Sequence, residues 1–248
     1  MNSRRIFAAR AVVLPLCLSS LCLAQSAPAP AARNSVVIVH VKPDMVNEWI
    51  ALQKNELIPA QKKGGVKTRT TYQTVLGNSF EYVTVTPSAK FAELDGPSPL
   101  VGALGAEGAA RLTAKLSKCL DSRQVFISNS LPELSYLPTG ELPPMGVFSR
   151  RRIAPGKMQE YEDFIKTEIL PIYKKAKEPY TVTRRGLGAN NNDVTSISWV
   201  NKASDLDAGP PTTRALGAAG AAKLAARTAG LATLVDQVVR RRVAELSY

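Results

Sequence analysis

The sequence contains one nine-residue stretch twice: Leu104-Gly105-Ala106-Glu107-Gly108-Ala109-Ala110-Arg111-Leu112 and, 112 positions later, Leu216-Gly217-Ala218-Ala219-Gly220-Ala221-Ala222-Lys223-Leu224. The same offset places residues 133–136 on 245–248. It gives 26 identities over 101 pairs without a gap, where composition alone gives roughly 7. The sequence therefore predicts two tandem copies, residues 36–136 and 145–248, joined by a Pro/Gly-rich linker at 137–144.

Each copy carries the same order of secondary-structure signals. In the first copy, β-branched runs indicate strands at 36–41, 68–76, 80–86 and 124–131, and apolar residues at helical spacing indicate helices from Asp44 onward and near 104–120. The second copy repeats the order with strands at 148–153, 181–187, 194–199 and 237–243 and helices at 157–175 and 216–232. The predicted fold class is α+β: two βαββαβ units, each with both helices on one face of an antiparallel sheet.

The first 24 residues have the order of a signal peptide. Three arginines precede an apolar run that is too short to span a bilayer, and an Ala/Pro-rich segment at 25–35, predicted to be a disordered linker, follows. The sequence therefore predicts a periplasmic or secreted protein with no membrane span. Removal of the leader changes the net charge from +12 to +12 − 3 = +9. A basic surplus favours anionic partners, and export argues against nucleic acid among them.

Several residues recur at positions that indicate structure. Trp49 and Tyr161 lie on the apolar stripe of the first helix of each copy, and Cys119 lies on the stripe of a second helix, so all three are predicted to be core residues. Glu56 and Glu168 each precede a proline by three residues. A kinked helix with a capping or salt-bridging acid explains that recurrence.

With this element order and duplication, residues 36–248 resemble the ferredoxin-like dimeric α/β-barrel superfamily in its tandem single-chain form, near the antibiotic-biosynthesis-monooxygenase and NIPSNAP-type members. The resemblance implies that the two copies pack as one α/β barrel, with their uncovered sheet faces inward. The superfamily includes cofactor-free monooxygenases, isomerases, haem enzymes and binding proteins. The resemblance therefore predicts the fold and leaves the activity open.

The alternation of side chains along a strand suggests which residues point into such a barrel. One face of the first copy carries His40, Thr70, Tyr72, Tyr82, Thr84, Thr86, Ser128 and Ser130. The same face of the second copy carries Arg150, Arg152, Arg184, Ser196, Ser198, Arg240 and Arg242. Five arginines on one wall predict a site for a small anionic ligand, because the guanidinium fork pairs well with carboxylate, phosphate and sulfate. A slip of one strand register would instead turn arginines outward to solvent.

Candidate catalytic residues are few. His40 is the only histidine, and with Tyr72 it forms the candidate catalytic pair, His40 as general base; a polar lining role without catalysis is the alternative. The resemblance disfavours His40 as a haem ligand, because it lies on the first strand of the first copy. The sequence contains no Walker loop, dinucleotide fingerprint or zinc-ligand cluster. We therefore expect no metal and no cofactor.

Three functions remain open. The first is an exported protein that binds a small anionic organic ligand inside the barrel. The second is a cofactor-independent monooxygenase or isomerase, and the third is a non-catalytic module that binds anionic polymers of the cell envelope through its basic surface. Substitutions between the copies gather on the inward faces, which favours a ligand inside the barrel. The expected assembly is a monomer or a homodimer.

Overall fold

The computed structural model describes residues 32–88 and 90–248. The predicted signal peptide and most of the predicted linker at 25–35 lie outside these residues. The first strand, β1 (Arg33–Val41), begins three residues before the predicted strand start at Val36. The end of the predicted linker is therefore part of the sheet, paired with both β3 and β4.

The two halves of the described chain have the same element order, strand–helix–strand–strand–helix–strand. The first half contains β1, α1 (Val46–Leu52), α2 (Ile58–Lys63), β2 (Thr70–Leu76), β3 (Glu81–Ser88), α3 (Pro99–Lys118) and β4 (Leu120–Ser130). The second half contains β5 (Met145–Ile153), α4 (Met158–Phe164), α5 (Leu170–Ala176), β6 (Tyr180–Arg185), β7 (Asp193–Val200), α6 (Pro211–Leu231) and β8 (Ala232–Arg242).

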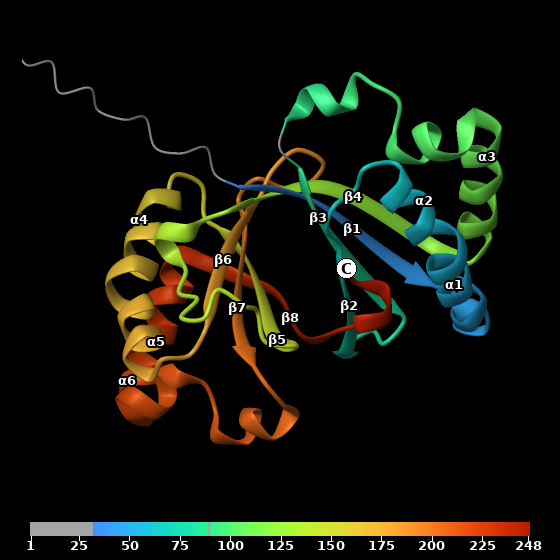
Figure 1. The fold of residues 1–248 in the computed structure, drawn as a ribbon. Helices are drawn as coiled ribbons and strands as arrows, with labels where there is room; N and C mark the ends of the chain where they lie inside the picture. Colours follow the sequence, from blue (N-terminus) through green and yellow to red (C-terminus); the bar gives the residue numbers. More distant parts are fainter. Residues whose placement is uncertain (1–31, 89) are drawn as a thin grey trace, which may run out of the picture. The chain divides into compact units, whose positions relative to one another are not determined.

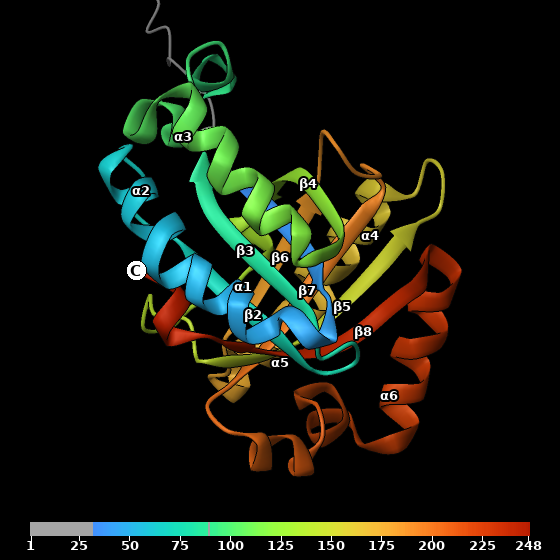
Figure 2. The same cartoon turned by 90° about the vertical axis from the view of Figure 1, so that its right-hand side faces the viewer.

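The eight strands form one closed antiparallel barrel in the order β1-β3-β2-β8-β5-β7-β6-β4. Each half supplies four neighbouring strands. The two sets join at their edges, where β2 pairs with β8 and β4 pairs with β6. The helices lie outside the barrel, α1–α3 over the strands of the first half and α4–α6 over those of the second (Figures 1 and 2). The predicted α+β barrel is confirmed.

The long helices begin earlier than the sequence patterns predicted. α3 begins at Pro99 and α6 at Pro211, five residues before the predicted starts, because a proline is well tolerated in the first helical turn. The hydroxyl of Ser98 also accepts a hydrogen bond from the backbone N–H of Val101 and caps α3. Gly105 and Gly217 then adopt positive φ angles of 72° and 65° and kink the two helices at equivalent positions.

The first helix of each half contains a π-helical turn, Gln53–Leu57 and Ile165–Ile169, just before its proline. These turns account for the recurring acid. Glu56 forms a salt bridge with Lys115 of α3, and Glu168 forms one with Arg227 of α6. The predicted salt-bridging role is therefore confirmed in both halves.

Apolar side chains form two cores between helices and sheet, one in each half. Trp49 and Cys119 are buried in the first, and Tyr161 is buried in the second, as predicted. A smaller cluster inside the barrel contains Tyr72 and Phe148, together with Ile197 and Trp199. None of the helices in residues 32–88 and 90–248 is long and apolar enough to cross a membrane.

Candidate functional site

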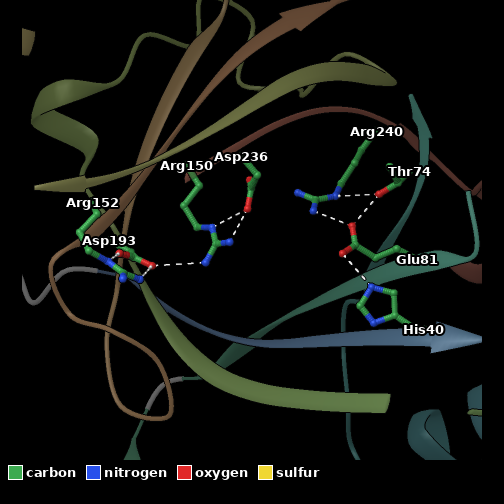
Figure 3. Close-up of polar contacts among 8 residues, drawn as sticks. All are labelled: His40, Thr74, Glu81, Arg150, Arg152, Asp193, Asp236 and Arg240. Atoms are coloured by element: carbon green, nitrogen blue, oxygen red, sulfur yellow. Dashed lines mark hydrogen bonds and ion pairs between the residues drawn. The ribbon is translucent and has the colours of Figure 1, made fainter. Parts of the chain in front are cut away.

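Two of the predicted arginines lie on the inner face of the barrel but are neutralised by acids. Arg150 donates from Nε to Asp236 at 2.7 Å and contacts Asp193 at 3.3 Å. Arg152 donates from Nε to the other oxygen of Asp193 at 2.8 Å. Asp193 is only 1 % exposed, so these pairs are part of the folded interior (Figure 3). The two arginines are therefore already paired with protein carboxylates.

A second group of paired charges lies elsewhere along the inner face (Figure 3). Arg240 contacts Glu81 at 2.7 Å, and Thr74 donates its hydroxyl to the same carboxylate at 2.7 Å. His40 lies 3.4 Å from the other oxygen of Glu81, through Nε2. Opposing charges from Arg240 and His40 lower the pKa of Glu81, against the effect of its burial.

The acids Glu81 and Asp193 are the residues that the sequence analysis missed. They are 112 positions apart and hence equivalent in the two copies. Each contacts the basic residue at the equivalent position of the first strand of its half, His40 of β1 for Glu81 and Arg152 of β5 for Asp193. An acid that recurs at the start of the third strand of each copy was a signal for these pairs.

The placement predicted for Arg184 is wrong. On β6, Arg185 lines the barrel interior, and Arg184 points to the other face, where its Nε donates to the carbonyl oxygen of Asn191 at 2.9 Å. The structure pairs Thr183 with Thr195, whereas the first half pairs Tyr72 with Val83. The structural offset between β2 and β6 is therefore 111 residues, and this one-residue shift reverses every side chain of β6.

Arg242 and Tyr72 are neighbours across the β2–β8 junction, where the strand register pairs them directly. Arg242 is exposed, whereas Tyr72 is buried in the interior aromatic cluster, with its ring centroid 5.7 Å from that of Phe148. Burial raises the pKa of Tyr72 to about 12, although the nearby Arg242 opposes the shift. The Tyr72 hydroxyl is therefore protonated at neutral pH.

His40 and Tyr72 do not form a catalytic pair in this structure. Tyr72 lines the interior cavity, but His40 is not among the lining residues. The Nδ1 atom of His40 lies 2.8 Å from the hydroxyl of Ser122, and Nε2 faces Glu81. Both ring nitrogens therefore have protein partners, which fits a structural polar role on the sheet better than a general base.

The inward faces predicted for β3 and β7 are also reversed. The hairpin register pairs Tyr72 with Val83, so Val83 points inward, whereas Tyr82 packs against Trp49 under the helices with ring centroids 4.5 Å apart. Thr84, Ser196 and Ser198 lie on the helix-covered side as well. These hydroxyls contribute to the layer between helices and sheet.

The second half contains a cavity of about 970 Å³ between its sheet and the covering helices. Its floor is the outer face of β5, β6, β7 and β8. Its walls come from α4, the π-helical turn that follows α4, α5 and α6. The first turn of α6 lines the cavity with residues 211–214, and the middle of the helix lines it mostly with small residues: Ala221, Ala222, Ala225 and Thr228, beside Leu224. α6 buries only Pro211 and Leu231, near its two ends, because the space beneath its middle is open.

Arg151 and several hydroxyls point into this helix-covered cavity, whose lining also includes Lys177, Asp205 and the ion pair of Arg214 with Glu178. Arg151 of β5 donates from Nη1 to the hydroxyl of Ser196 at 3.2 Å and has no carboxylate partner within the described residues. The hydroxyls of Tyr173 and Ser198 lie 2.5 Å apart. The rings of Tyr173 and Tyr180 stack with centroids 4.3 Å apart. The cavity therefore offers an arginine, several hydroxyls and a stacked aromatic wall.

The three buried tyrosines remain neutral under ordinary conditions. Burial raises the pKa of Tyr161 and of Tyr173 and raises the pKa of Tyr180 well above its usual value. Arg151 opposes each of these shifts, through a hydrogen bond in the case of Tyr161. Neutral phenols beside a guanidinium can donate hydrogen bonds to a negatively charged oxygen of a ligand.

The lining residues do not fit a haem group. Neither cavity is lined by a histidine, cysteine or methionine, and His40 is engaged elsewhere. The tyrosines are the remaining candidates for an axial ligand. Burial holds their pKa high, which disfavours the phenolate that iron binds. Within residues 32–88 and 90–248, no group of three or more His, Cys, Asp or Glu side chains could hold a metal ion.

No protein-family model and no curated protein matches this sequence. Among solved structures, an anthrone oxidase-like protein is similar with a TM-score of 0.59 and 11% identity, over 86% of this chain and 92% of that one. A provisionally assigned monooxygenase from Lactobacillus acidophilus has a TM-score of 0.52 and 10% identity, over 88% and 95%.

A mutant chlorite dismutase from Candidatus Nitrospira defluvii, in complex with cyanide, has a TM-score of 0.51 and 8% identity, over 88% of this chain and 92% of that one. Identities this low establish the fold alone. The chain therefore has the fold of the dimeric α/β-barrel superfamily, as its element order and duplication predicted.

Proposed function

We propose that the protein is exported and binds a small aromatic organic anion, phenolic or carboxylated, in the helix-covered cavity of its second half. The observation that carries the proposal is Arg151, a cation without a protein carboxylate that faces a cavity of about 970 Å³. An anionic ligand would supply the missing partner, and the tyrosine hydroxyls would bond its remaining oxygens. The proposal keeps the anionic ligand that the sequence predicted, but places this site under the helices and not inside the barrel.

Three further features support this function. The size and mixed lining of the cavity are those of small-molecule sites. The stacked pair Tyr173 and Tyr180 provides a flat aromatic surface. The similar structures include one named as a provisionally assigned monooxygenase and one named as an anthrone oxidase-like protein. We also infer that the two halves are ferredoxin-like repeats, since each pairs its four strands in the same order.

The experiment is a calorimetric titration of the mature protein with 1-hydroxy-2-naphthoate and with neutral 1-naphthol. We expect the acid to bind more tightly than the naphthol, because only the acid pairs with Arg151. Arg151→Gln should weaken binding of the acid about tenfold or more, since a hydrogen-bonded charge pair contributes roughly 1.5–3 kcal/mol. The affinity for naphthol should change little.

Arg241→Gln serves as the matched control, because Arg241 is an exposed arginine outside both cavities. It removes the same charge and should leave both affinities unchanged. Equal binding of acid by wild type and Arg151→Gln would contradict the site. Absence of binding by either compound would favour the third interpretation, an envelope-binding module that acts through the basic surface. Mass spectrometry of the extracellular and periplasmic fractions tests export and the leader: absence of the protein from both would contradict export, and a form that begins at Met1 would contradict removal of the leader.

A cofactor-independent oxygenase is the second candidate. The observation that favours it is the position of Arg151 beside neutral tyrosine hydroxyls, which could stabilise the oxyanion of a deprotonated substrate. Anthrone tests the idea, because its oxidation to anthraquinone consumes one O₂ and forms one water. Oxygen uptake that is lost in Arg151→Gln would support an oxygenase, and no uptake above the buffer rate would leave a binding protein.

A further inference from the structure

The barrel interior contains a second cavity, of about 520 Å³, which shares Trp199 with the helix-covered cavity and is otherwise lined by different residues. Most of its lining is apolar. Strands of the first half contribute Val36, Ile38, Val83, Val85 and Phe126, and strands of the second half contribute Phe148, Ile197 and Trp199. Leu137 and Leu142 of the linker also line it, and each is 38% exposed. The cavity is therefore an apolar space with an apolar border to solvent.

Arg185 is the exception among the arginines of this interior. Arg150 and Arg240 each contact a carboxylate, but no acid of the described chain lies within ion-pair distance of Arg185. Residues 1–31 and position 89 contain no aspartate or glutamate that could pair with it. Its Nε atom is buried without a hydrogen-bond partner among the described residues. Its guanidinium lies 4.5 Å above the ring of Phe126.

The surroundings of Arg185 favour the arrival of a negative charge. Burial, together with the nearby Arg150 and Arg240, lowers the pKa of Arg185 to about 10, against the opposing effect of Asp193 and Asp236. Arg185 therefore remains charged at neutral pH in a place that opposes its charge. A buried cation without a partner is destabilising, and a ligand anion removes that penalty.

We propose that the barrel interior binds a small hydrophobic carboxylate, whose head group pairs with Arg185 and whose apolar part occupies the interior between the two halves. The strand register places Ser128 directly opposite Arg185, so its hydroxyl is available to the same head group. Ser128 is 5% exposed and, like Ser130, lines the cavity. The apolar part of the ligand then contacts the cluster around Phe148 and Trp199.

The sequence also predicted an anion site inside the barrel, but with other arginines as its cations; the interior site proposed here uses Arg185. The arginines at 150, 152 and 240 are paired with acids, Arg184 faces outward, and Arg185 carries the unpaired charge. One free guanidinium in an apolar cavity matches a monoanion with a hydrophobic body. A multiply charged phosphate or sulfated sugar would lack both the counter-charge and the polar surface that it requires.

The experiment is a fluorescence titration with octanoate and with neutral 1-octanol in a Trp49→Phe background. The sequence contains two tryptophans, so Trp199 in the cavity wall then reports binding. We expect saturable binding of octanoate, with octanol at least tenfold weaker because it lacks the charge. Arg185→Gln should weaken octanoate by a similar factor and leave octanol unchanged.

Arg184→Gln is the matched control, because it removes the neighbouring arginine, which faces the opposite side of β6. It should bind octanoate like the Trp49→Phe parent. Circular dichroism and the melting temperature confirm that both variants fold. Equal octanoate affinity in Arg185→Gln and Arg184→Gln would overturn the proposal, as would octanol binding as tightly as octanoate.

Arg151→Gln separates the two cavities. An octanoate site at Arg185 is unaffected by Arg151→Gln, whereas naphthoate binding in the helix-covered cavity is weakened about tenfold or more. Loss of octanoate binding in Arg151→Gln with full retention in Arg185→Gln would place octanoate under the helices and overturn the interior site. Failure of naphthoate to bind, with octanoate dependent on Arg185, would overturn only the proposed function of the helix-covered cavity.

Discussion

The layer between helices and sheet is filled in the first half of the molecule and open in the second. In the first half, Arg69 is 2% exposed and lies under the π-helical turn at Gln53–Leu57 and α2. It donates to Gln53 at 2.5 Å and to Gln61 at 2.8 Å, with longer bonds to Thr71 and Thr84. A buried guanidinium with four neutral acceptors therefore fills this layer and joins helix to sheet.

The second half places a tyrosine at the same point. Tyr180 exchanges two backbone hydrogen bonds with Tyr136, and Arg69 exchanges the same two with Tyr248, so Tyr180 and Arg69 are structural equivalents. α3 buries Ala103, Ala109 and Leu112, whereas the middle of α6 stands over the helix-covered cavity. One copy thus uses its polar residues for stability, and the other keeps Arg151 and its tyrosines open to a ligand.

The largest difference in stability between the two halves should come from substitution of Arg69 and of Arg151. Arg69→Ala leaves several buried acceptors without a donor and creates a void, so we expect the free energy of unfolding to fall by about 3 kcal/mol or more. Arg151→Ala should lower it by no more than about 1 kcal/mol, because water in the cavity can replace its bonds. Urea unfolding of both variants measures the difference. Similar losses for the two would contradict the division into a structural and a ligand-facing half.

Equivalent alanines on the long helices test the packing directly. Ala109 is 6% exposed under α3, and its counterpart Ala221 lines the helix-covered cavity under α6. Ala109→Leu should destabilise the protein by about 1–3 kcal/mol through overpacking. Ala221→Leu should change stability by less than about 0.5 kcal/mol, since the added atoms enter open space, and should weaken naphthoate binding. If Ala221→Leu lowers the free energy of unfolding as much as Ala109→Leu does, the cavity is closed in solution.

Alkaline pH should affect the two equivalent residues with opposite sign. Burial raises the pKa of Tyr180, so the native state keeps a proton that the unfolded chain releases near pH 10. The stability that Tyr180 contributes is therefore complete below pH 10 and is lost as the pH rises above it. Tyr180→Phe should make the decline in unfolding free energy above pH 10 shallower, by up to about 1.4 kcal/mol per pH unit.

Arg69 behaves in the reverse way, since burial lowers its pKa to about 10 and the native state loses its proton before the unfolded chain does. The free-energy cost of burying the positive charge of Arg69 is complete below pH 10 and is relieved as the pH rises above it. Arg69→Met should therefore make the alkaline decline steeper. Urea unfolding between pH 8 and 11, at one ionic strength, measures both slopes. Slopes that change in the same direction for both variants would show that the tyrosine and the arginine are not buried as the structure places them.

How far the sequence predicts this molecule depends on how the repeat is read. The ungapped offset of 112 locates the equivalent salt bridges of Glu56 and Glu168, because no residue is inserted between those helices. It fails at β6, where one residue fewer precedes the strand and Arg185 replaces Arg184 on the inner face. A gap of one residue leaves almost no trace in an identity count, yet it reverses a whole strand.

The site was harder to predict than the fold for a related reason. Inner and outer faces of β3 depend on the register of the β2–β3 hairpin, which alternation along a single strand does not fix. The acids that neutralise the interior arginines come from strands distant in the sequence, as in the pair of Arg240 and Glu81. The helix-covered cavity results from small residues on α6. The first copy has the same pattern on α3, but Arg69 fills its layer, so the pattern alone does not predict a cavity.

The smallest effect should come from the equivalent salt bridges that join the first helix of each half to its long helix. Glu56→Gln and Glu168→Gln should each lower the free energy of unfolding by no more than about 1 kcal/mol, because both pairs are partly exposed and screened by salt.

Local opening of the two long helices should nevertheless differ. α6 is buried only near its ends, so the bond from Glu168 to Arg227, whose guanidinium also lies 5.3 Å above Phe164, is a larger share of what holds it. Glu168→Gln should therefore speed amide hydrogen exchange in α6 more than Glu56→Gln does in α3, and 0.5 M NaCl should reduce that contrast. Equal protection of α3 and α6 in the two variants would mean that the helix over the open cavity is held as firmly as the helix over the filled one.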